Sequence, residues 1–196
     1  MPSRRDVLAG GTALGMASAL GAPRLARAAS SIVKPQGLVL QTSLTSLAPA
    51  MRIAARSAER VFAFDQDVGH LWLSQLDAGH AVRGQTLAGV SSGGALFGLE
   101  ELLRDHGMRL AALVQLDTRA LKVAGQPQWA SAVSKRLDSA PDPVAAAMVE
   151  IAAGAPRFAL PGLPAERFAA APDGAAFAWI IAPDPRRPVF IATRSV

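Results

Sequence analysis

The 196-residue sequence contains no cysteine and only three histidines, His70, His80 and His106. The absence of cysteine excludes disulfides, thiol catalysis, iron–sulfur clusters, covalently attached haem and zinc held by thiolates. Three histidines spread along the chain do not form a histidine-rich metal motif. We therefore expect a protein with no resident metal ion and no other cofactor.

The sequence also lacks a concentrated basic segment and a long apolar run. The formal net charge is +5, but four arginines and one aspartate in the first 28 residues account for +3 of it, which leaves +2 for the remainder. No Lys/Arg block is interleaved with aromatic residues, so we expect no nucleic-acid partner. The apolar run from Val7 to Pro23 is shorter than the about 20 residues that a membrane-spanning helix needs, so we expect no stable membrane anchor.

The N-terminus carries the most specific motif of the chain. Ser3-Arg4-Arg5-Asp6-Val7-Leu8 precedes that weakly apolar run, and Ala26-Arg27-Ala28 closes it with a small-x-small cleavage box. This segment resembles the twin-arginine (Tat) export signal of bacteria. The resemblance implies that the protein folds in the cytoplasm, crosses the inner membrane through the Tat translocase, and is cleaved after Ala28. It would then be a periplasmic or secreted protein.

We therefore expect three parts: a signal peptide at 1–28, a tether at 29–36, and a single α/β domain at 37–196. In that domain short apolar runs alternate with helical patterns, which is typical of a mostly parallel sheet with helices on both faces, of Rossmann-like or flavodoxin-like type. Two C-terminal apolar runs predict an edge hairpin. The expected strands are 38–40, 61–64, 86–90, 110–116, 177–182 and 189–193, and the expected helices are 47–58, 67–78, 95–106, 129–137 and 144–153.

Gly89-Val90-Ser91-Ser92-Gly93 spells G-x-S-x-G between a predicted strand and a predicted helix. This resembles the nucleophile elbow of α/β-hydrolases, and the resemblance would make Ser91 a nucleophile. Those enzymes place their catalytic histidine after the serine, and no histidine follows His106 here. A serine hydrolase therefore stays a minor alternative.

Asp65 and Asp67 form an Asp-x-Asp motif directly after the apolar run 61–64. This resembles the first motif of Mg²⁺-dependent haloacid-dehalogenase-type phosphohydrolases. The resemblance implies that Asp65 is the nucleophile, Asp67 the general acid and Ser91 the phosphate-binding residue, with Lys122 as a loose match to the required cation. The sequence departs from that pattern because Asp117 lacks the acidic neighbour that would complete the Mg²⁺ site. A phosphohydrolase is therefore the second alternative.

The same residues can instead have structural roles in helix capping and in turns, with no catalytic function. Asp67 can cap the helix that it precedes, and Ser91 or Ser92 can cap the next helix. Gly93-Gly94 permits a tight turn between strand and helix. Trp72 and Phe97 lie on apolar helix faces and are expected in the core.

If the sheet is parallel, polar residues gather where its strands end, and ligands of α/β sheets bind along that edge. The N–H groups of the turn at Gly93 suit an anion, whereas the aspartates oppose one, so the ligand stays open. We expect a non-catalytic protein that binds a small ligand or assists an exported partner protein. The candidate pocket consists of Asp65, Asp67, His70, Ser91, Ser92, Gly93, Gly94 and Asp117.

Overall fold

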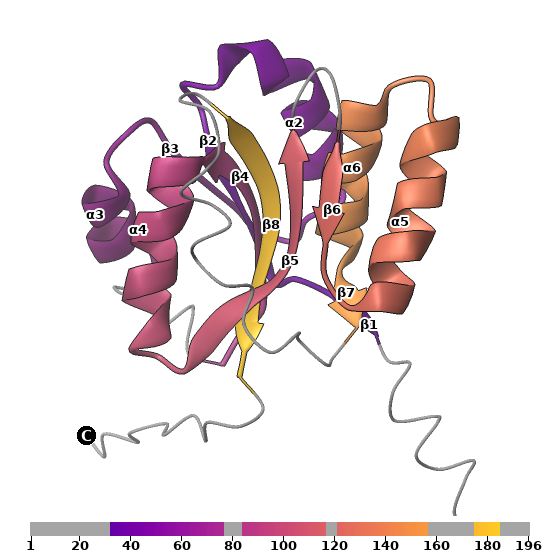
Figure 1. Cartoon of the computed structure of the whole chain (residues 1–196). Coiled ribbons are helices and arrows are strands. Elements are labelled where there is room, and N and C mark those ends of the chain that lie inside the picture. Colours follow the sequence, from indigo (N-terminus) through magenta and orange to yellow (C-terminus); the bar gives the residue numbers. More distant parts are fainter. Residues whose placement is uncertain (1–31, 77–83, 117–120, 157–174, 185–196) are drawn as a thin grey trace, which may run out of the picture. The chain divides into compact units, whose positions relative to one another are not determined.

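The computed structural model describes residues 32–76, 84–116, 121–156 and 175–184, which form an α/β structure (Figure 1). The twin-arginine pair Arg4-Arg5, the cleavage residues Ala26 and Ala28, and Asp117 lie outside these residues. The expected tether contains a short strand, β1 (Ile32–Val33), which pairs antiparallel with β7 (Ala155–Pro156). None of the helices in the described ranges has the length and apolar character that a membrane crossing requires.

A six-stranded mixed sheet forms the centre of the structure, in the order β3-β2-β4-β8-β5-β6. Strand β2 lies between β3 and β4 and pairs parallel with both, as predicted for the N-terminal half. β8 is antiparallel to both β4 and β5, and β6 is antiparallel to β5. The strands are β2 (Gly37–Gln41), β3 (Val61–Phe64), β4 (Leu87–Ser92), β5 (Met108–Leu116), β6 (Lys122–Ala124) and β8 (Ala176–Pro183).

The prediction of a mostly parallel, Rossmann-like sheet with an edge hairpin is wrong. Three of the five strand pairings are antiparallel, and β8 lies in the interior of the sheet between β4 and β5. Its first six residues, Ala176–Ile181, are all apolar and buried, because an interior strand is covered on both faces and paired along both edges. The second strand of the expected hairpin, at 189–193, lies outside the described residues.

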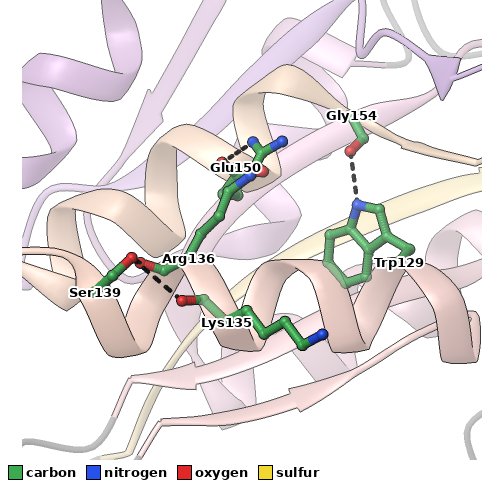
Figure 2. Close-up of polar contacts among 6 residues, drawn as sticks. All are labelled: Trp129, Lys135, Arg136, Ser139, Glu150 and Gly154. Atoms are coloured by element: carbon green, nitrogen blue, oxygen red, sulfur yellow. Dashed lines mark hydrogen bonds and ion pairs between the residues drawn. The ribbon is translucent and has the colours of Figure 1, made fainter.

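One face of the sheet is covered by three helices, α2 (Ala48–Ala55), α5 (Pro127–Ser139) and α6 (Pro143–Ala153). A short 3-10 turn, η1 (Thr45–Leu47), leads into α2. Two polar contacts join α5 to α6 and its end (Figure 2): the indole of Trp129 donates to the Gly154 carbonyl at 3.2 Å, and Arg136 pairs with Glu150 at 2.6 Å.

The opposite face is covered by α3 (Val68–Leu71), the π-helical segment η2 (Trp72–Leu76) and α4 (Gly93–Arg104). Trp72 is buried as predicted, and its ring lies 5.1 Å from that of His106. Phe97 was expected in the core, but it is 57% exposed, so that prediction is wrong. The buried side of α4 is set by Ala95, Leu96, Leu99 and Leu103, and Phe97 projects from the other side.

Candidate functional site

Asp65, Asp67 and His70 follow the carboxyl end of β3, and all three are exposed. The Asp67 carboxylate accepts a hydrogen bond from the backbone N–H of His70 at 2.8 Å and so caps the N-terminus of α3. This confirms the capping role predicted for Asp67. Within the described ranges, no three His, Asp or Glu side chains gather closely enough to hold a metal ion.

Ser91 is fully buried, and it does not have the exposed hydroxyl that a nucleophile elbow needs. Its Oγ accepts a hydrogen bond from the indole N–H of Trp179 at 3.0 Å. Trp179 lies opposite Gly89 on the neighbouring strand, where a Cβ would come within 2.1 Å of the indole ring. Gly89 and Ser91 therefore accommodate a core tryptophan, and this packing accounts for the first half of the G-x-S-x-G motif.

Ser92, Gly93 and Gly94 begin helix α4. The Ser92 hydroxyl caps the helix by accepting from the Ala95 N–H at 3.4 Å, as predicted for one of the two serines. The Gly93 N–H donates to the Ala175 carbonyl at 3.3 Å, and the Ser92 N–H donates to another side chain, that of Gln41. Three of the N–H groups that would suit an anion are thus already used within the protein.

The site predicted from the sequence did not include Gln41, Thr42 and Ser43, which follow the apolar residues of β2. Gln41 is buried, and its Oε1 accepts from the Ser92 N–H at 2.8 Å while its Nε2 donates to the Ser43 hydroxyl at 3.0 Å. The Ser43 hydroxyl donates to the Asp65 carbonyl at 2.8 Å, and the Thr42 hydroxyl donates to the Phe64 carbonyl at 3.0 Å. Polar residues that end an apolar run were the signal in β3 and β4, and the same signal is present in β2.

This hydrogen-bond network lies at the ends of β2 and β4, two neighbouring strands from which the chain continues toward opposite edges of the sheet. From β2 the chain continues through α2, on one face, to β3; from β4 it continues through α4, on the other face, toward β5 (Figure 1). In open α/β sheets the carboxyl ends of two strands at such a reversal are the usual ligand site. Here Gln41 and Ser92 join the ends of these two strands.

The structure separates Asp65 from Ser91. β2 lies between their strands, so the two backbones are about two strand spacings, roughly 10 Å, apart. The buried Ser91 hydroxyl is in addition bonded to Trp179, and Lys122 begins β6 at the far edge of the sheet. The residues matched to the phosphohydrolase motifs therefore do not converge on one phosphate position in the described part of the chain.

In comparisons with known proteins, no family model, no curated protein sequence and no solved structure matches this chain. The fold defines an α/β protein with a mixed sheet.

Proposed function

We propose that the chain is an exported α/β protein that binds a small polar ligand, without catalysis, at the carboxyl ends of β2 and β4. The observation that carries this proposal is the convergence of polar groups from three parallel strands. Gln41 ends β2 and Ser43 follows it, Asp65 follows β3, and Ser92 ends β4. Hydrogen bonds join these four residues into one network. A network that fixes loops from three strands is a rigid base on which a ligand can bind.

The chemistry of this edge favours a neutral or cationic ligand that donates hydrogen bonds. The N–H groups of Ser92, Gly93 and Ala95 are engaged, so the helix terminus offers an anion little. The exposed carboxylate of Asp65 forms no ion pair with any described residue. These contacts support a ligand that the aspartates attract over an anion held by the turn.

A non-catalytic role is supported by the structural contacts of the two side chains that could act as nucleophile or general acid. The Ser91 hydroxyl is buried against Trp179, and one carboxylate oxygen of Asp67 caps a helix. A nucleophile or general acid has to reach its substrate, and these contacts hold both groups in structural roles.

Native mass spectrometry of the protein purified from an exporting bacterium tests the proposal. We expect a co-purifying small molecule, or an exported partner protein if the chain assists such a partner. Thermal shift measurements with putrescine, glucose and inorganic phosphate then identify the chemical class, and we expect phosphate to have the smallest effect. Asp65→Asn should reduce the shift produced by an amine, while the matched change Asp138→Asn on α5 should leave it unchanged.

The phosphohydrolase alternative makes a different prediction for the same variant. A Mg²⁺-dependent turnover of an aryl phosphate that is lost in Asp65→Asn would replace ligand binding with catalysis as the function of this edge. Turnover that persists in Asp65→Asn would point to a contaminating enzyme.

A further inference from the structure

Strand β3 forms one end of the sheet in the described part of the chain. Its Arg60, Phe62 and Phe64 positions direct their backbone groups toward β2, as the bonds from Leu38 N–H to Arg60 O and from Thr42 N–H to Phe64 O show. In a parallel ladder the intervening residues, Val61 and Ala63, direct their N–H and C=O groups away from β2. No described strand pairs with that side of β3.

Apolar side chains are exposed on this strand. Val61 is 45% exposed and Ala63 is also exposed, although both belong to a strand. Exposed apolar groups on an edge strand are characteristic of an interaction surface.

Charges of opposite sign flank the strand, and they favour antiparallel pairing with a second β3. Arg60 immediately precedes β3 and Asp65 immediately follows it; both are exposed, and neither forms an ion pair with another described residue. If β3 pairs antiparallel with β3 of a second copy, the basic end of each strand meets the acidic end of the other. A parallel arrangement would bring like charges together.

We propose that the open edge of β3 pairs antiparallel with the same edge of a second copy, forming a two-fold dimer with a continuous sheet. Pairing Val61 of one copy with Ala63 of the other joins the outward backbone groups of both residues in each strand. Arg60 then lies opposite Phe64 of the second copy and one residue from its Asp65, and the symmetry repeats this contact. The isologous geometry closes on itself, so association stops at the dimer. This inference does not depend on the proposed ligand.

Gln75 competes for the same edge. Its side-chain amide donates to the outward Ala63 carbonyl at 3.1 Å, which the Val61 N–H of a second copy would also use. Because the strand has only four residues and one acceptor is already engaged, the dimer is weak, with a dissociation constant on the order of micromolar. Association should therefore depend on protein concentration.

Sedimentation velocity of the full chain over an about hundredfold concentration range tests the proposal. We expect a shift from monomer to dimer. Arg60→Glu and Asp65→Arg should each weaken association about tenfold, because each creates two like-charge contacts. An equimolar mixture of these two variants should associate again, as heterodimers in which every contact joins opposite charges. The matched changes Lys135→Glu and Asp138→Arg, on α5, should have no effect.

Circular dichroism establishes that each variant is folded. Gln75→Ala leaves the charges unchanged and frees the Ala63 carbonyl, so it should tighten association about threefold. A chain that stays monomeric at every concentration would overturn the proposal. A dimer that is insensitive to both charge changes, or one that Gln75→Ala weakens, would likewise show that another surface is used.

Discussion

The indole N–H of Trp179 donates a hydrogen bond to the buried hydroxyl of Ser91, 3.0 Å away on the neighbouring strand. The two residues are diagonal neighbours on the antiparallel strands β8 and β4, since Trp179 lies directly opposite Gly89 and Ser91 lies opposite Phe177. Diagonal pairs of this kind are within reach of a long aromatic side chain. A tryptophan can be buried in this core because Gly89 leaves space for its ring and Ser91 accepts its polar hydrogen.

Replacing Gly89 by alanine should destabilise the fold strongly. The new Cβ would lie 2.1 Å from the indole of Trp179, a rigid group in a packed core. Overpacking of this kind costs typically about 1–3 kcal/mol, and we expect a loss near the upper end in the free energy of unfolding measured with urea. Gly94→Ala is the matched control, because its Cβ meets no atom within 4 Å, and it should be neutral or stabilising by about 0.5 kcal/mol. Equal effects of the two changes would contradict the packing role of Gly89.

Ser91 should be structurally important and chemically inert. Ser91→Ala leaves the buried indole N–H without its acceptor and should cost about 1–2 kcal/mol of unfolding free energy. In a double-mutant cycle with Trp179→Phe, the two changes should show a coupling of about 1 kcal/mol. A fluorophosphonate probe should leave the native protein unlabelled at Ser91, as read by mass spectrometry of the peptide. Labelling there would instead support the serine-hydrolase alternative.

Glu100 should make stability depend on pH. Burial raises the pKa of its carboxyl above the ordinary value of 4.5, and the opposing attraction of Arg104 is the smaller effect. The folded state therefore holds the proton more tightly than the unfolded state, so stability falls as the pH rises from 4.5 through the pKa of the folded state. Glu100→Gln removes this penalty and should raise the melting temperature at pH 7. The gain should vanish below pH 4.5.

Glu101→Gln is the control for this measurement. Glu101 pairs with the same Arg104 at 2.8 Å, but its side chain is 44% exposed. Exposed pairs contribute little to stability, so this change should alter the melting temperature only slightly at any pH. A gain at pH 7 that matches that of Glu100→Gln would mean that burial of Glu100 is not the cause.

Export should depend on the paired arginines. Changing Arg4-Arg5 to Lys-Lys should leave full-length precursor in the cytoplasm, whereas the unchanged chain should be found in the periplasm with Ala29 as its first residue. Cell fractionation followed by N-terminal sequencing measures both outcomes. Unchanged export of the Lys-Lys variant, or export through the general secretory channel, would contradict the twin-arginine assignment.

The local elements and the parallel direction of β2, β3 and β4 could be predicted from the sequence, but the position of β8 in the sheet could not. Strand β3 begins and ends at the predicted residues, and α4 is displaced from its predicted range by two residues at each end. Periodicity and capping residues determine these elements locally. The position of β8 depends on pairing with β4, about 90 residues earlier, and an apolar run does not indicate its partner strand.

The candidate site was predicted in part for the same reason. Asp65 and Ser92 were identified because each follows or ends an apolar strand. Gln41 joins them only because β2 lies between β3 and β4, an order that the sequence does not reveal. Ser91 was placed in the candidate pocket because the alternation of side chains along β4 could not be oriented before its partner Trp179 was known.

The interior position of β8 also determines when the sheet can be completed as the chain is synthesised. β4 and β5 lie on either side of a strand that is synthesised after both of them, so the central gap in the sheet is filled only when residues 176–183 have emerged. Until then both strands expose edges that would pair indiscriminately with other chains. Assembly of the central sheet therefore waits until β8 has been synthesised, and its first residue comes 60 residues after the last residue of β5.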